Sequence, residues 1–232
     1  MFDESAQLLE RGIYVPLCNP NLELEYIKSP NHVELNVFSL AEGRFSVAKT
    51  NFNKSNAISW EGFRQGLVND ISLIYNDAKK QDCNTVLFSN EGLYLLNSEE
   101  EYLVLQGLFL KHTDSIKVLC CFRDVEDFQK SYKRQLFKMG FSASSKPDSF
   151  RYLEPDSWLF DYERKKRLVS SVFPDAVYWS YDSKDNVKAF LKLIGASDLQ
   201  LKTRRLNQSR LGQIFIGRCK KVISWAVRKL KR

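Results

Sequence analysis

Long apolar runs are absent from this 232-residue chain. No window approaches the roughly 20 consecutive apolar residues that a transmembrane helix needs, so the sequence predicts no membrane-spanning helix. The first residues, MFDESAQLLERG, contain acidic side chains and no apolar core, which argues against a secretory signal peptide. Hydrophobic residues make up 44% of the chain and aromatic residues 13%, which indicates a folded protein.

Cysteine is scarce and has no metal-ligand spacing. The chain has five cysteines, which are Cys18, Cys83, Cys120, Cys121 and Cys219. Two of them lie in an apolar run, where thiols behave as small hydrophobic side chains. We therefore predict reduced structural cysteines, a cytoplasmic location and no metal site.

Acidic residues are missing from the C-terminal end. Beyond Asp198 there are eleven Lys or Arg residues and no acid, whereas residues 1–198 hold 24 basic and 28 acidic side chains, a net charge of −4. The pattern predicts an acidic α/β domain over residues 1–209 and a basic segment over 210–232. Since the domain itself is acidic and contains no recognisable nucleic-acid module, we predict no nucleic-acid partner.

The basic segment has an apolar stripe at helical spacing, formed by Leu211, Phe215, Cys219, Val222, Ala226 and Leu230. Two interpretations stay open. A basic amphipathic helix with a tryptophan suits an anionic membrane surface, here the inner face of the membrane. The same pattern suits a terminal helix that packs on the domain with its basic face in solvent.

Glycine-rich phosphate loops are also absent. None of the ten glycines belongs to a G-x-x-x-x-G-K-[S/T] or G-x-G-x-x-G motif. What is present is an alternation of short apolar strands with helices, which is typical of a parallel sheet covered on both faces. Strands are predicted at 84–89, 115–122 and 176–181. Helices are predicted at 2–11, 31–41, 59–80, 98–112, 125–138, 158–172 and 185–195.

Arg123 stands at the end of the strand 115–122, and Ser131 lies about two turns into the next helix. Ligands of parallel sheets bind beyond the carboxyl ends of the strands. A guanidinium and a hydroxyl there suit a phosphate monoester. The alternative is structural: Asp124 caps the helix and Arg123 pairs with Asp127.

Glu91 follows the strand 84–89 in the same way. A carboxylate at this edge could act as a general base toward a substrate hydroxyl. Alternatively, Asn90, Glu91 and Gly92 form a strand-to-helix turn with a solvated acid. His32 could likewise face a substrate or serve in a loop or cap.

These motifs, in this order, resemble the sulfotransferases that use 3′-phosphoadenosine 5′-phosphosulfate (PAPS), in particular bacterial members that act on surface polysaccharides. The matching motifs are LLERGIYVP, the pair Asn31-His32, Ser89-x-Glu91-x-Leu93, Arg123 with Ser131, the segment FDYERKKRLVSSVFPDAVYWSYDS, and RRLNQS at 204–209. The resemblance covers most of the chain up to about residue 210.

The resemblance implies a three-layer α/β/α sheet of the P-loop nucleoside-triphosphatase type. It implies that Arg123 and Ser131 hold the 3′-phosphate of PAPS, that Glu91 acts as the base, and that no metal takes part. The acceptor would be a hydroxyl of a saccharide or glycolipid.

The family's first strand and phosphosulfate loop would lie upstream of Met1, so the chain is expected to bind the nucleotide but to transfer sulfate poorly. A start assigned too late, a fragment and a degenerate enzyme all explain this. The alternative function is a non-catalytic nucleotide- or glycan-binding protein associated with a membrane.

Overall fold

The structure, a computed structural model, describes residues 2–16, 32–55, 58–181 and 186–199. The chain divides into two compact units, Met1–Ser197 and Asp198–Arg232, and the description below concerns the first. The predicted boundary at residue 209 and the predicted helix 210–232 lie outside the described residues, as does Asn31.

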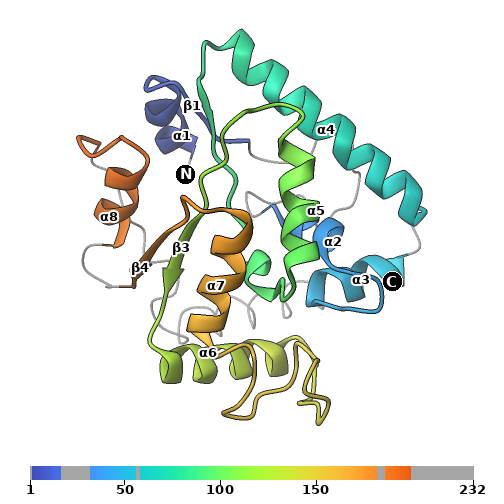
Figure 1. Cartoon of the computed structure of the whole chain (residues 1–232). Helices are drawn as coiled ribbons and strands as arrows, with labels where there is room; N and C mark the ends of the chain where they lie inside the picture. The colour runs from blue at the N-terminus through green and yellow to red at the C-terminus, as the bar shows by residue number, and fades with distance from the viewer. Residues whose placement is uncertain (1, 17–31, 56–57, 182–185, 200–232) are drawn as a thin grey trace, which may run out of the picture. The chain divides into compact units, whose positions relative to one another are not determined.

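The unit is mixed α/β and mainly helical (Figure 1). Its helices are α1 Phe2–Leu9, α2 Val33–Ser39, α3 Val47–Ser55, α4 Trp60–Lys80, the 3-10 helix η1 Glu91–Leu95, α5 Glu99–Phe109, α6 Val125–Lys138, α7 Tyr162–Val172 and α8 Asn186–Leu193. Its strands are β1 Ile13–Tyr14, β2 Thr85–Val86, β3 Leu119–Phe122 and β4 Val177–Ser180.

The described strands form two separate parallel pairs, β1 with β2 and β3 with β4. Ile13 lies opposite Thr85 in the first pair, and Leu119 lies opposite Val177 in the second. Figure 1 shows β2 and β3 running in the same direction, with α5 returning between them. The β2–α5–β3 segment is therefore a parallel crossover unit whose two strands are not hydrogen-bonded to each other.

The main core lies between the helices α2, α4, α5 and α7 and one face of the strands. Helix α4 contributes the stripe that its periodicity predicts, and the hydroxyl of Ser59 caps it by accepting from the N–H of Gly62 at 3.0 Å. The buried members of the stripe are Phe63, Leu67, Ile71, Ile74 and Ala78. Burial of each large side chain contributes about 1.5–3 kcal/mol.

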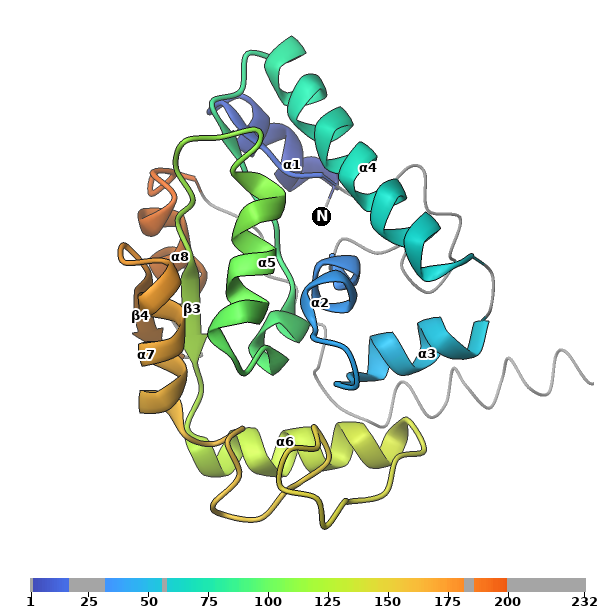
Figure 2. The same ribbon diagram turned by 45° about the vertical axis from the view of Figure 1, so that its right-hand side comes forward.

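A second, smaller core lies beneath α6. Leu136 of α6 packs there with Leu95 of η1 and with apolar side chains of the segment 150–160. Both Figure 1 and Figure 2 show α6 lying across the C-terminal end of β3. This placement brings the first turns of α6 to the strand end at which the sequence predicts a ligand.

The predicted mixed α/β class is confirmed, and α6 spans the predicted residues. The three predicted strands are present but shorter, and α7 begins at Tyr162 because Asp161 caps it there. Strand β1 and helix α3 are not among the predicted elements. The finer expectation of one three-layer P-loop-type sheet stays a prediction, because the strands form two pairs.

None of the helices in the described ranges combines the length and the apolar character needed to cross a bilayer.

Candidate functional site

The structure brings Arg123 and Ser131 together in one shallow pocket of about 240 Å³, whose lining residues are all exposed to solvent. Its lining is completed by Asp127, Lys130 and Arg134. Arg123 immediately follows β3, and the other four belong to α6 at three- and four-residue steps, which places them on one face of that helix. The pocket has three cationic groups, one carboxylate and one hydroxyl.

The structural alternative for residues 123–131 is that Asp124 caps the helix and Arg123 pairs with Asp127; the structure shows the first and not the second. The carboxylate of Asp124 does cap α6, since it accepts from the N–H of Asp127 at 3.1 Å. The expected ion pair between Arg123 and Asp127 is not formed. Within the described ranges, the guanidinium of Arg123 has no carboxylate within ion-pair distance, and it lies 5.5 Å from the ring centre of Tyr181.

This charge distribution suits a small, doubly charged anion. Lys130 is paired with Glu126 on the exposed side of α6 at 3.1 Å, whereas neither arginine of the pocket forms an ion pair with any residue that the structure describes. Arginine offers forked donors that match phosphate oxygens. At about 240 Å³ the pocket fits a phosphate group, because pockets for whole drug-sized ligands are typically larger, about 300–1,000 Å³.

A larger depression lies elsewhere, between β4 and α8, with a volume of about 430 Å³. Apolar side chains and the two lysines Lys117 and Lys192 line it. It includes none of the site residues that the sequence predicts.

Glu91 lies on a turn that neighbouring side chains hold firmly. The Oδ1 of Asn90 accepts from the N–H of Gly92 at 2.6 Å, and Asn36 of α2 donates to the carbonyl of Gly92 at 2.7 Å. The amide of Asn90 also donates to the carbonyl of His32. The Glu91 side chain itself points into solvent and has no hydrogen bond or ion pair with another described residue.

His32 is buried, and both of its ring nitrogens contact the backbone. Its Nε2 lies 2.9 Å from the carbonyl oxygen of Pro16, beyond β1, and its Nδ1 lies 3.2 Å from the N–H of Ser89, beyond β2. Burial lowers the pKa of His32, which favours a neutral ring that donates through Nε2 and accepts at Nδ1. The histidine therefore ties together the chain segments that leave β1 and β2.

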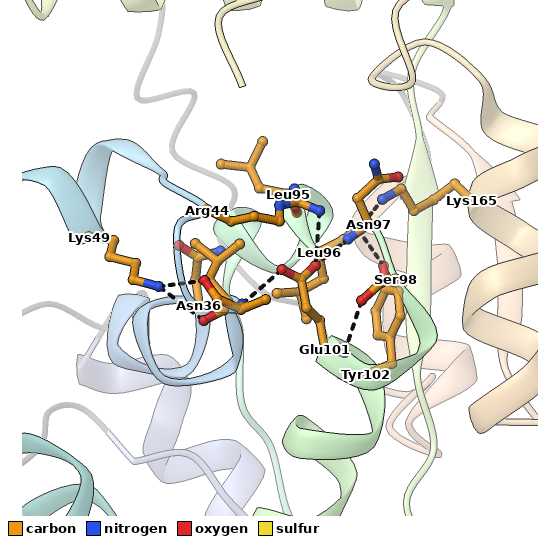
Figure 3. Close-up of polar contacts among 12 residues, drawn as sticks. Asn36, Arg44, Lys49, Leu95, Leu96, Asn97, Ser98, Glu101, Tyr102 and Lys165 are labelled. Atoms are coloured by element: carbon orange, nitrogen blue, oxygen red, sulfur yellow. Dashed lines mark hydrogen bonds and ion pairs between the residues drawn. The ribbon is translucent and has the colours of Figure 1, made fainter. Parts of the chain in front are cut away.

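A buried network of charges lies behind these turns and is not predicted from the sequence (Figure 3). At its centre is Glu101 of α5, which is 1% exposed. Its carboxylate accepts from Arg44 at 3.2 Å and from the backbone N–H groups of Ala41 at 2.9 Å and Asn97 at 2.6 Å. The network joins the segment after α2 to the start of α5.

Two buried lysines flank Glu101, as Figure 3 shows. Lys49 of α3 donates to the carbonyls of Leu40 at 3.0 Å and Ala41 at 2.8 Å. Lys165 of α7 donates to the carbonyl of Leu96 and lies 5.3 Å from the ring centre of Trp158. Burial, assisted by the charge of Arg44, lowers the pKa of Lys165 to about 7.

One signal in the sequence could have pointed to Glu101. Ser98-x-x-Glu101 has the spacing of a capping box, in which the glutamate turns back toward the helix start. Here the hydroxyl of Ser98 accepts from the N–H of Glu101 at 3.3 Å, and the glutamate reaches back to Asn97. Its burial against α2 depends on tertiary packing and has no local pattern.

Comparison of the chain with family models, with curated proteins and with solved structures finds no match. The resemblance to PAPS-dependent sulfotransferases therefore rests on the sequence motifs and is a prediction. So are the roles of Arg123, Ser131 and Glu91.

The turn that carries Glu91 makes a first prediction. A Cβ at Gly92 would lie 2.8 Å from the Oδ1 of Asn90 and 3.1 Å from the Cβ of Asn36. We expect Gly92→Ala to lower the free energy of unfolding by about 1–3 kcal/mol because these buried neighbours must move. Urea unfolding followed by circular dichroism measures the change.

Gly107→Ala is the matched control. A Cβ at Gly107, in α5, would meet no atom within 4 Å. This substitution should stabilise the protein by about 0.5–1 kcal/mol, because alanine favours the helix. Equal effects of the two substitutions would contradict the close packing at Gly92.

Lys165 makes a second prediction, on the pH dependence of stability. Burial lowers its pKa from an ordinary 10.5 to about 7, so above pH 7 the unfolded chain binds a proton that the folded chain lacks. The free energy of unfolding should therefore rise by up to about 1.4 kcal/mol per pH unit between about pH 7.5 and pH 8.5, above which unfolded cysteines begin to ionise. Closer to pH 7 the buried carboxyl of Glu34, whose pKa burial raises to about 7, opposes this rise.

Urea unfolding at three pH values in this window measures the slope. Lys165→Met should abolish it, whereas Lys166→Met, at the neighbouring half-buried position, should leave it unchanged. A slope that survives in Lys165→Met would show that another group causes it.

Proposed function

We propose that this chain is a sulfotransferase-like protein that binds the 3′-phosphoadenosine part of PAPS through Arg123 and Ser131. The observation that carries the proposal is the pocket that these two residues share with Lys130 and Arg134. The sequence motif requires a guanidinium at a strand end and a hydroxyl eight residues later. The fold of α6 places both against the same small volume.

The chemistry of the pocket supports a phosphate monoester as its ligand. Arg123 supplies a forked pair of donors, Ser131 a hydroxyl donor, and Arg134 a second guanidinium. Asp127 also lines the pocket, and its carboxylate disfavours a second anion. The residues present thus fit the 3′-phosphate of the cofactor.

The strand topology supports the P-loop type of sheet. Strands β2 and β3 run in the same direction and have no mutual hydrogen bonds (Figure 1). Their apolar side chains are only half-buried, as at Val86, Leu119 and Cys120, although central strands of a parallel sheet are normally buried on both faces.

PAPS, when bound, supplies the sulfuryl group for transfer to a hydroxyl of a saccharide or glycolipid. We assign the role of accepting the proton of that hydroxyl to Glu91. It lies beyond the C-terminal end of β2, as Arg123 lies beyond that of β3. Asn36 and Asn90 hold the backbone of its turn in place, and the carboxylate itself is exposed to solvent, so a substrate can reach it.

The second candidate is a non-catalytic protein that binds a nucleotide or a glycan. The observation that favours it is the pocket itself, whose two guanidinium groups and hydroxyl suit the binding of an anion without any transfer step. The two candidates share the pocket of Arg123 and Ser131 and differ in the role of Glu91.

Nucleotide binding gives the third prediction. Calorimetric titration should show that 3′-phosphoadenosine 5′-phosphate binds at least tenfold more tightly than adenosine 5′-phosphate, which lacks the 3′-phosphate. Arg123→Ala should remove most of this preference, because a charge-assisted hydrogen bond contributes about 1.5–3 kcal/mol. Ser131→Ala should reduce it by a smaller factor.

Arg167→Ala is the control. Arg167 is exposed on α7 and lies outside the pocket, so its substitution removes the same charge at a different position. It should keep the preference for the 3′-phosphate. Equal affinities for the two nucleotides in the unaltered protein, or an equal effect of Arg123→Ala and Arg167→Ala, would refute the assignment.

The role of Glu91 gives the fourth prediction. With PAPS and a panel of saccharide and glycolipid acceptors, Glu91→Gln should lower any sulfate transfer by at least about 100-fold, the lower range for general base catalysis. The affinity for 3′-phosphoadenosine 5′-phosphate should not change. No transfer by the unaltered protein, together with intact nucleotide binding, would favour the non-catalytic candidate.

A further inference from the structure

The C-terminal half of α6 has an exposed apolar tip. Phe137, in the last turn of α6, is 50% exposed, and Met139, the C-cap residue two positions further on, is 49% exposed. The inward side of the same helix is already occupied, since Phe128, Tyr132 and Leu136 pack on the smaller core. Phe137 and Met139 are not members of that core, and about half of each side chain is open to solvent.

The apolar tip is surrounded by positive charge. Between Tyr132 and Pro147 the chain has four basic residues and no acidic one; they are Lys133, Arg134, Lys138 and Lys146. All four are exposed, and the ammonium of Lys133 lies 5.9 Å from the ring centre of Phe137. This local excess stands out in a domain whose first 198 residues carry a net charge of −4.

Exposed apolar side chains next to basic ones favour an anionic membrane over a soluble polyanion as the partner. A soluble polyanion would need the cations alone and would gain nothing from Phe137 and Met139. The interface of an anionic bilayer accepts both, because apolar side chains enter the acyl region while lysines and arginines stay at the headgroups. Each basic side chain near such a surface contributes about 1 kcal/mol.

We propose that Phe137, Met139 and the surrounding cations of α6 form a docking surface for an anionic membrane. The surface is separate from the basic segment 210–232, and the proposal does not depend on nucleotide binding. Phe137 continues, one turn further, the face of α6 that lines the pocket of Arg123. A membrane bound at Phe137 would thus lie beside that pocket.

Sedimentation of the full chain with vesicles tests the apolar half of the surface. The vesicles contain phosphatidylcholine with 30% phosphatidylglycerol, or phosphatidylcholine alone as the neutral control. Phe137→Ser with Met139→Ser should weaken binding to the anionic vesicles at least tenfold. The matched control is Leu103→Ser with Leu110→Ser on α5, where the exposed fractions are 48% and 51%; it should change binding less than twofold.

Charge substitutions test the other half. Lys133→Gln with Lys138→Gln should weaken binding to anionic vesicles about 30-fold, which corresponds to about 1 kcal/mol for each lysine. Lys79→Gln with Lys80→Gln at the end of α4 removes the same charge elsewhere and should have a much smaller effect. All variants are first compared with the unaltered protein by circular dichroism.

The surface is refuted if either α6 variant behaves like its control, because the basic segment 210–232 would then account for vesicle binding. It is also refuted if the protein binds dextran sulfate and anionic vesicles equally well and Phe137→Ser with Met139→Ser affects neither. In that case the cations of α6 serve a soluble polyanion.

Discussion

The structure depends on the hydrogen bonds and the ion pair that stabilise one buried carboxylate, that of Glu101. Glu101 is almost fully removed from solvent, and an uncompensated charge at that depth would cost several kcal/mol. Arg44 and two backbone N–H groups satisfy its oxygens, while Lys49 and Lys165 bond to carbonyls on either side. Because these groups come from the α2–α3 region, α5 and α7, their positions are fixed together.

That fixed region supports the turns at which the strands end. Asn36 of α2 holds the turn of Glu91, and His32 joins the segments that leave β1 and β2. The other strand pair delivers Arg123 to the start of α6, whose cap at Asp124 orients the helix. The proposed phosphate anchor and the proposed base thus lie beyond the strand ends. The turns that hold them are stabilised by hydrogen bonds within the protein and do not require a bound ligand.

Periodicity and capping residues predict most of the fold. The stripe of α4 with its Ser59 cap and the bounds of α6 follow from local spacing, and the structure agrees with both. Strand β1, only two residues long, has no periodicity to detect. Burial of Glu101 depends on partners some 60 positions away in the chain, which no local pattern encodes.

The central claim is that Arg123 and Ser131 bind the 3′-phosphate of the nucleotide, and a crystal structure with 3′-phosphoadenosine 5′-phosphate tests it most directly. The account predicts oxygens of the 3′-phosphate within about 2.7–3.2 Å of the Arg123 guanidinium and the Ser131 hydroxyl. A nucleotide bound elsewhere, or bound with its 3′-phosphate away from both side chains, would contradict it.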